Sequence, residues 1–257
     1  NNFVSSYRIS KFVVDWMRER GDMRLPKLAE MMIKLDGKNA DPTDLANYKG
    51  VIPNPGATGD NNNTDMEDGS QSRLKSKWYL EPVGPSAMNI GYPEQEFILA
   101  EAALRGWTED DPETHYLNGI RAAHEFLGVS SADTRAYLGH EKVQFKGSDT
   151  EKLGKIITEK YLNFFMQGGN EAYFELRRTG YPDFSAYLTH NTDQIYNDGY
   201  LPLRYRYPQS EIDNNNAQVS EAIKRLDKGD DRNSRMWLLQ GSDPLFNPAP
   251  FPFRYKN

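Results

Sequence analysis

Apolar residues recur at helical spacing close to the start of the chain. Four of them share the spacing i, i+3, i+4 and i+7 of one helix face: Ile9, Phe12, Val13 and Trp16. Gly21 follows this stretch, and glycine commonly ends a helix because it accepts the left-handed conformation. The pattern therefore predicts a helix that stops before Gly21, and a second short helix over residues 28–35 after Pro26.

The same periodicity dominates residues 93–178. Pro93 suits the first turn of a helix, and an apolar stripe follows it as far as Gly106. A second helix opens at Asp111-Pro112-Glu113, has Phe126 among its inward positions, and ends at Gly128. Two helices of this length joined by a short turn form an antiparallel hairpin, which is the repeating unit of tetratricopeptide solenoids.

A capping box marks the start of the next helix. Ser148 and Glu151 have the spacing of this motif, in which each side chain bonds the backbone of the other residue. Apolar residues at helical spacing continue to Phe165, Gly168-Gly169 interrupts them, and Asn170 can cap the helix that follows. We therefore predict a mainly α fold with at least two tetratricopeptide-like helical hairpins, long irregular loops and minor β structure.

Residues 36–92 have no helical period. They contain repeated proline and glycine, and the run GDNNNTD over 59–65 cannot bury apolar area. Loops of this length inside a compact chain are usually functional or disordered. Trp78 and Tyr79 near the end of the segment indicate that part of it is ordered.

The C-terminal part changes pattern again. Between Tyr200 and Pro208 apolar and polar residues alternate with a period of two, which predicts an extended or edge strand. Asn214-Asn215-Asn216 favours a helix cap, followed by a last short helix over 219–226. Four prolines in 244–257 predict an irregular tail.

Composition narrows the classes of function. Asp and Glu number 37 against 31 Lys and Arg, a net charge of -6, whereas nucleic-acid binding rests on basic patches. No apolar run approaches the roughly 18 residues that a membrane span needs. Cysteine is absent, which excludes disulfides, thiolate catalysis and Cys-ligated zinc. Aromatic residues make up 12% of the chain.

The polar residues give no clear metal site. His115, His124 and the other two histidines lack the spacing of a zinc motif, and we interpret them as surface or capping residues. The acidic run near Asn62 invites calcium, but an EF-hand needs Gly and Glu where this chain has Asp65 and Gln71. An irregular calcium loop and a solvated polar loop both stay open, and no other cofactor is expected.

No motif for covalent chemistry emerges, so we predict a protein that is not an enzyme. With 37 carboxylates in the chain, a pair suited to a glycosidase can always be found. Such a pair in the sequence is therefore no evidence for a glycosidase. Glu101 lies among alanines and is expected to bond a neighbouring helix. We interpret Arg177-Arg178, at the end of an aromatic helix, as structural residues that bind terminal carbonyls and stack on aromatic rings.

Five segments, taken in order, resemble the C-terminal half of the SusD/RagB family of Bacteroidetes outer-membrane lipoproteins. They are Asp22-x-Arg24-Leu25-Pro26, YPEQEFILAEAALRG over 92–106, Tyr116-Leu117-x-Gly119-Ile120, the stretch 157–182 ending in RRTGYP, and the closing motif over 202–216. Their order and spacing carry the resemblance. It implies that 1–257 is the C-terminal part of such a domain, with hairpins over about 93–178, ligand loops over about 36–92, and no N-terminal half.

The resemblance implies a function and a place in the cell. Family members capture extracellular glycans and deliver them to a TonB-dependent, SusC-like transporter, with no covalent chemistry. The expected partners are thus a glycan and that transporter, with no nucleic acid. The expected location is the exposed face of the outer membrane, through a lipid anchor that this cysteine-free chain lacks.

Sugar sites combine exposed aromatic platforms with hydrogen-bonding side chains on loops. Residues 36–92 supply both, so our candidate ligand-binding residues are Trp78, Tyr79 and Tyr48, with Asn62 as a polar candidate. Trp78 can equally anchor the loop to the core. Two other functions stay open: oligopeptide capture, as in RagB-type members, and a helical scaffold with no small ligand.

Overall fold

The computed structural model describes residues 7–33, 40–51, 69–184, 186–187 and 202–234. The chain forms two compact units, 1–173 and 174–257. In the described ranges the regular structure is helical, and β structure is limited to three isolated bridges. This arrangement confirms the predicted mainly α fold with minor β structure.

The first unit contains six α-helices and two short 3-10 helices among its described residues. They are α2 (Lys11–Glu19), α3 (Leu25–Leu28), η1 (Leu45–Asn47), η3 (Ser76–Trp78), α4 (Tyr92–Leu104), α5 (Pro112–Phe126), α6 (Ser131–Gly139) and α7 (Asp149–Asn163). Helix α8 (Gly169–Thr179) spans the boundary between the two units. None of the described helices is long and apolar enough to cross a membrane.

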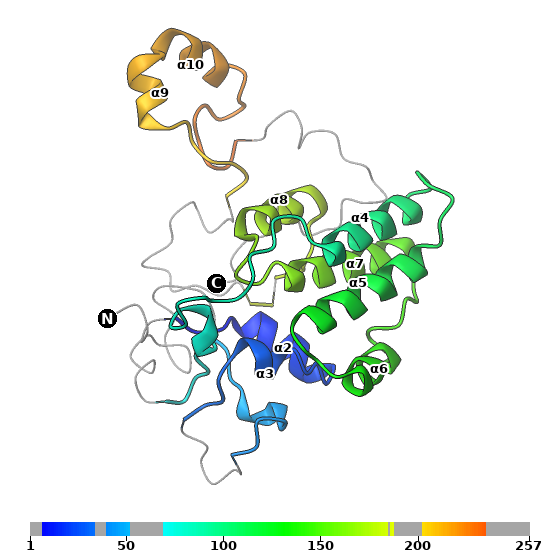
Figure 1. The fold of residues 1–257 in the computed structure, drawn as a ribbon. Coiled ribbons are helices and arrows are strands. Elements are labelled where there is room, and N and C mark those ends of the chain that lie inside the picture. Colours follow the sequence, from blue (N-terminus) through cyan, green and yellow to red (C-terminus); the bar gives the residue numbers. More distant parts are fainter. Residues whose placement is uncertain (1–6, 34–39, 52–68, 185, 188–201, 235–257) are drawn as a thin grey trace. The chain divides into compact units, whose positions relative to one another are not determined.

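Helices α4 and α5 form the predicted hairpin, and α7 packs beside them (Figure 1). Phe97 of α4 and Ile120 of α5 are both fully buried. The helices approach closely at Gly119, where an added Cβ would lie 2.6 Å from Phe97 Cε1. Gly106 and Gly128 follow the two helices with φ of +70°, and this left-handed backbone ends each helix as predicted.

The start of α7 confirms the capping box, but its end differs from the prediction. Ser148 Oγ accepts a hydrogen bond from the Glu151 backbone, and the Glu151 carboxylate accepts one from the Ser148 backbone. The helix stops at Asn163, and Met166 has a φ of +60°, which no helix continues through. Helix α8 begins at Gly169, so the predicted cap Asn170 lies inside it.

The predicted helix over 28–35 is wrong. Helix α3 ends at Leu28, and Ala29 is extended with a ψ of 157°. The next residues pair with the loop segment instead, because Glu30 N donates to Arg73 O at 2.8 Å and Ile33 N donates to Gly69 O at 3.0 Å. Backbone pairing across 40 residues of sequence here outweighs the local helical pattern.

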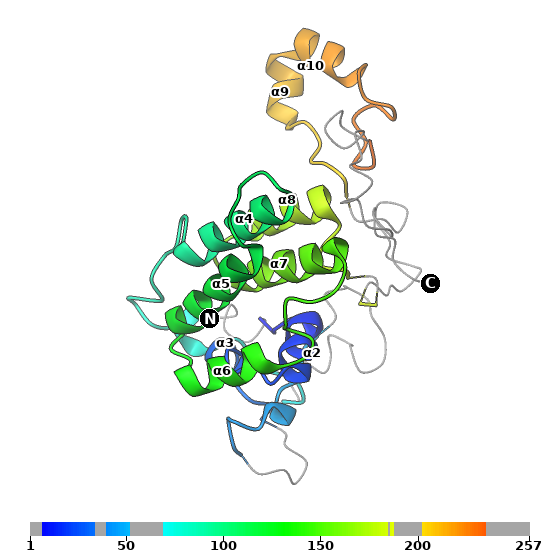
Figure 2. The same cartoon turned by 90° about the vertical axis from the view of Figure 1, so that its right-hand side faces the viewer.

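Helix α6 was not predicted, because its sequence has little amphipathic character. It begins where Ser130 Oγ accepts a hydrogen bond from Asp133 N. Its buried face consists of Thr134 and Tyr137. Figure 2 shows α6 beside α2 and α3, which is where Tyr137 meets the first part of the chain.

The described part of the second unit contains two short helices, α9 (Gln209–Asn214) and α10 (Asn216–Ile223). The predicted last helix over 219–226 thus begins earlier and ends earlier. The predicted strand is absent from 202–208, where the backbone N–H groups of Leu203 and Arg204 both donate to a single carbonyl, that of Arg232. The tail over 244–257 lies outside the described residues.

The arginine pair near the end of α8 is structural. Arg177 Nη1 donates to Leu203 O at 2.8 Å, and its guanidinium lies 5.0 Å from the Phe174 ring centroid. Arg178 Nη2 lies 2.5 Å from a Glu175 carboxylate oxygen. The predicted stacking on an aromatic ring is confirmed. The carbonyl that Arg177 bonds belongs to Leu203, and not to the end of its own helix as predicted.

Candidate ligand-binding site

The segment that carries Trp78 is held by backbone hydrogen bonds to the start of the chain. Lys75 N donates to Leu28 O at 2.8 Å, one residue beyond the bridge between Ala29 and Leu74. The 3-10 helix η3 follows, and Trp78 N donates to Lys75 O at 3.0 Å. The irregular segment is therefore fixed in place on both sides of this bridge, and the position of Trp78 is set by pairing that spans about fifty residues of sequence.

Trp78 is half-buried and packs on the residues that follow α7. Its ring meets Phe165 edge to face, with centroids 5.9 Å apart and planes at 73°. Lys77 Nζ lies 5.3 Å from the centroid of the Trp78 ring. The indole is thus held by an aromatic neighbour and accompanied by a cation, while part of its surface stays accessible.

A shallow hollow of about 10 Å³, room for about one water molecule, lies beside Trp78. Two helix ends and the α3 region line it: Arg24, Leu28, Trp78, Ala123, Phe126, Leu127, Leu162, Asn163, Phe165 and Gln167. Phe126 is 43% exposed and lies at the surface. Three aromatic rings and a few polar groups thus meet at one shallow hollow.

Gln167 ties the neighbouring loop to this wall. Its Nε2 donates to Ser86 O at 3.1 Å, and its Oε1 accepts from Met88 N at 2.9 Å. Both hydrogen bonds join segments about eighty residues apart in the sequence. They place residues 86–88 near the end of α7, so the loop that precedes α4 is fixed close to the hollow.

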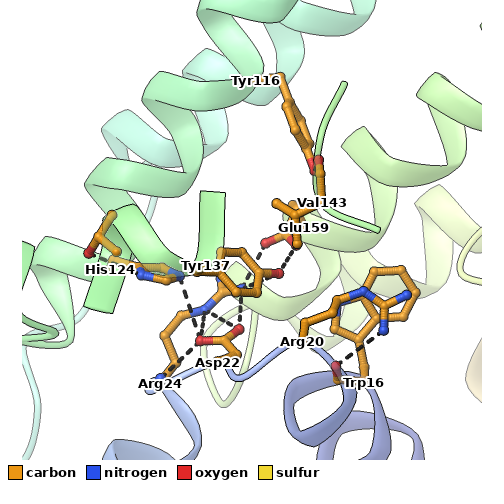
Figure 3. A network of polar contacts seen from close by, with 10 residues as sticks. Trp16, Arg20, Asp22, Arg24, Tyr116, His124, Tyr137, Val143 and Glu159 are labelled. Carbon is orange, nitrogen blue, oxygen red and sulfur yellow. Dashed lines mark hydrogen bonds and ion pairs between the residues drawn. The ribbon is translucent and has the colours of Figure 1, made fainter. Parts of the chain in front are cut away.

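A buried network of charges lies behind the hollow, centred on Arg24 (Figure 3). The guanidinium bonds Asp22 through Nε at 2.9 Å and Nη2 at 2.6 Å, and its Nη2 also bonds Glu159 at 2.8 Å. Tyr137 donates a short hydrogen bond to Glu159. All four side chains are at most 1% exposed, so the cation is paired as a buried charge must be.

Burial and nearby charges shift two pKa values in this network: they oppose each other at Arg24 and act together at Tyr137. Burial alone would lower the pKa of Arg24, but Asp22 and Glu159 outweigh it and hold that pKa well above the usual value. Burial raises the pKa of Tyr137, and the Glu159 carboxylate raises it further. Arg24 is therefore cationic and Tyr137 neutral near neutral pH, which suits a scaffold better than acid–base chemistry.

His124 belongs to this interior and corrects the prediction of a surface or capping histidine. It is fully buried, its Nδ1 lies 3.2 Å from Thr134 Oγ1, and its ring packs on Tyr137. Burial and the charge of Arg24 lower its pKa to about 3, although Asp22 opposes the shift. The imidazole is therefore neutral at physiological pH.

Two further polar residues that the sequence singled out, His115 and Glu101, contact side chains of known identity. His115 Nδ1 lies 2.8 Å from a Glu96 carboxylate oxygen, which joins α5 to α4. Glu101 bonds Arg105, the residue that follows α4, at 2.8 Å. No group of three potential ligands able to hold a metal occurs among the described residues, and most of the candidate calcium loop, Asn62 included, lies outside them.

The structure separates the four candidate binding residues. Trp78 lines the hollow, whereas Tyr79 is half-buried and lies outside its wall. Tyr48 is only 1% exposed, and its hydroxyl donates to Pro42 O at 3.0 Å. The expectation that Tyr48 is exposed is therefore wrong, since a ring packed in the core presents no face to a sugar. Asn62 lies outside the described residues.

The sequence did not point to Phe126 and Phe165 as wall residues. Both fall on the apolar pattern of a helix and were expected to face inward, yet Phe126 is exposed and Phe165 follows the end of α7. The signal that could have found them is position, because both are aromatic residues at the C-terminal end of a helix. Side chains at such ends can extend past the packed core.

A family model and solved structures relate the chain to known proteins. A SusD-like family model, described as starch-binding and associating with the outer membrane, matches residues 2–208. No match was found among curated proteins.

Solved structures of SusD homologues are similar over almost the whole chain. One from Bacteroides fragilis is 32% identical with a TM-score of 0.79, over 91% of this chain and 52% of its own. A second from the same organism is 30% identical with a TM-score of 0.76, over 90% and 51%. A chitin-binding protein is 25% identical with a TM-score of 0.69, over 91% and 50%. The chain thus spans about half the length of these structures.

Proposed function

We propose that this chain, which belongs to the SusD-like family, binds an extracellular glycan without covalent chemistry. The description of the family as starch-binding supports a sugar ligand. The similar chitin-binding protein supports a glycan as the ligand class, although the sugar in this case need not be chitin.

The observation that carries the proposal is the aromatic hollow. Trp78, Phe126 and Phe165 come from three separate segments and line one shallow hollow. The C–H faces of a sugar ring pack on aromatic faces, and its hydroxyl groups need polar partners. Asn163 and Gln167 in the same wall carry amides of that kind, so the hollow combines both requirements.

We further propose that the bound glycan is delivered to a SusC-like, TonB-dependent transporter at the outer membrane. The family description, which associates its members with that membrane, supports the location. The protein would act at the exposed face of the membrane, attached in its full-length form by a lipid. Co-purification of the protein with such a transporter from outer membranes tests this proposal, and recovery of the protein without it would contradict it.

The binding site is tested by calorimetric titration with starch, chitin oligosaccharides and a peptide mixture. Trp78→Ala should weaken binding of the preferred glycan by about tenfold or more, because the stacked ring and its buried area are lost. Trp107→Ala is the matched control, since Trp107 is 71% exposed and is absent from the wall of the hollow. Its affinity should stay unchanged.

Three results would contradict the proposal. Equal affinity of the wild type and Trp78→Ala would show that the hollow is not the site. Binding of peptides with no glycan binding would support oligopeptide capture instead. Release of reducing ends from the glycan would identify an enzyme.

A further inference from the structure

Helix α4 carries apolar residues around its whole circumference. Seven of the eight residues from Phe97 to Leu104 are apolar, and Glu101 is the exception. A helix at the surface of a protein usually has a polar outer face, whereas a helix that is apolar all round is normally buried on all sides. The sequence of α4 therefore indicates a helix with neighbours on more than one side.

The helices α5 and α7 pack on the side of α4 where Phe97 is fully buried (Figure 1). The opposite side holds four apolar residues at the spacing i, i+6, i+7 and i+10 of one helix face: Tyr92, Ile98, Leu99 and Ala102. Tyr92 is 57% exposed and Ile98 is 46% exposed, while Leu99 and Ala102 are half-buried. This side of α4 is thus apolar and open to solvent.

Trp107 extends the open side past the end of the helix. Its backbone N–H donates to Ala102 O at 2.9 Å, the N–H of Gly106 donates to Ala103 O at 2.9 Å, and Gly106 has a φ of +70°. These bonds form a Schellman motif, which turns the residue after the glycine back toward the last turn of the helix. Trp107 is nevertheless 71% exposed. We define the outer face of α4 as Tyr92, Ile98, Leu99, Ala102 and Trp107.

The outer face has no charged residue, although 26% of the chain is charged. Permanent interfaces have an apolar centre that is depleted of charge, whereas the surface that meets a transient partner is about as polar as the rest of the protein. Three of the five side chains have no polar atom, so the face offers few groups to the hydroxyls of a sugar. Its chemistry fits an apolar protein surface that stays in place.

The tetratricopeptide-like arrangement of the helices indicates what kind of element covers such a face. In these folds a single helical hairpin cannot bury its apolar surface alone, and a neighbouring hairpin stacks on it. The α4–α5 hairpin has α7 on one side and the outer face on the other. Ala102 is a small residue between Ile98 and Trp107, and it leaves a groove into which side chains of a second helix can pack.

The similar structures are longer than the region that this chain matches. The match covers 52% of one Bacteroides fragilis homologue and 51% of the other. About half of each of these proteins therefore lies outside the region in common, which is ample length for further helical hairpins.

We propose that the outer face of α4 packs against a further helical hairpin, which belongs to the half of the SusD-like domain that this chain does not match. The partner is thus an apolar helix of the full-length protein. The inference depends on the family and on the surface of α4, and it is independent of the proposed glycan binding.

Single cysteines measure whether the outer face is covered. The chain has no cysteine, so an introduced thiol is the only one in the 257-residue protein, and its rate of labelling by a maleimide reports its exposure. Ile98→Cys probes the outer face, and Arg121→Cys, at an exposed position of α5, is the matched control. The same two variants are made in the full-length protein, with any other cysteine replaced by serine.

Both thiols should be labelled at similar rates in the 257-residue protein. In the full-length protein the labelling of Ile98→Cys should be at least about tenfold slower, because a covered thiol reacts only when the packed helices separate, while Arg121→Cys keeps its rate. Equal thermal unfolding of each variant and its parent excludes a folding defect. Trp107→Cys probes the same face if Ile98→Cys unfolds early.

The outcomes identify the occupant of the face. Equal labelling of Ile98→Cys in both proteins would overturn the proposal. Protection in the 257-residue protein that grows with its concentration would identify a second copy as the occupant, and would overturn the proposal as well. Protection in the full-length protein together with a failure to bind any glycan would support this inference and contradict the proposed function.

Discussion

His124 illustrates how a single residue depends on its surroundings. It has no exposed surface, and its Nε2 is 3.6 Å from Asp22 Oδ1, too far for a hydrogen bond. Burial and the nearby Arg24 favour the neutral ring. The sequence spacing that excluded zinc gave no information about this burial.

His124 should make the stability of the fold depend on pH. An unfolded histidine titrates near 6.5, whereas His124 in the fold titrates at about 3. The unfolded state therefore binds more protons between these values, so stability falls as pH drops through that window and is unaffected by His124 above it. The slope is at most ~1.4 kcal/mol per pH unit.

Urea unfolding of the wild type and His124→Gln between pH 4 and 8 measures this dependence. Glutamine cannot titrate, so the difference in unfolding free energy between the two proteins should change below pH 6.5 and stay constant above it. Carboxylates titrate in both proteins and cancel in that difference. A difference that is flat across the whole range would contradict a buried neutral histidine.

At the scale of the element, Gly119 controls how closely α4 and α5 approach. Gly119→Ala improves helix propensity by about 1 kcal/mol, but its Cβ would fall 2.6 Å from Phe97 Cε1 in a filled core. Overpacking of this kind costs about 1–3 kcal/mol, so we expect a net loss of stability. Thermal unfolding measures it.

Gly139→Ala is the control for this prediction. Gly139 also lies in a helix, and an added Cβ there meets nothing within 4 Å. This variant should be neutral or slightly stabilised. Destabilisation of both variants by the same amount would show that the Gly119 effect is not steric.

The capping box of α7 provides a second test at this scale. Ser148→Ala removes the acceptor for Glu151 N, and the Glu151 side chain loses its hydroxyl partner. The expected loss is about 1 kcal/mol of unfolding free energy. Ser131→Ala, in the first turn of α6 and without a side-chain cap role, should change stability by less than about 0.5 kcal/mol.

Elements with strong local signals were predictable from the sequence. The α4–α5 hairpin, its glycine stops and the start of α7 depend on residues close together in the chain. The predicted helix over 28–35 failed because Glu30 and Ile33 bond a segment about forty residues away. A local pattern cannot report such a competitor.

At the scale of the first unit, the Arg24 network joins distant parts of the chain. Arg24 bonds Glu159, 135 residues away, and Tyr137, 113 residues away. The segment DMRLP, which resembles a family motif, therefore has a structural role. It connects the start of the chain to α6 and α7.

Substitution of Arg24 should strongly lower the free energy of unfolding. Arg24→Ala leaves Asp22 and Glu159 buried without their cation, and breaking a buried pair in this way costs about 3–5 kcal/mol. Arg121→Ala, on the exposed face of α5, should stay within about 0.5 kcal/mol of the wild type. Denaturant unfolding compares the two variants. Similar losses of unfolding free energy in both would contradict the assignment of a buried network.

The sequence by itself determined the family, the mainly α class and the helical hairpin, because these depend on periodicity and on motifs read along the chain. Only the tertiary structure decided which aromatic residues share a wall. Trp78, Phe126 and Phe165 come together through backbone pairing and helix packing between distant segments, while the same forces bury Tyr48. Exposure is a property of the packed molecule, and no single residue type encodes it.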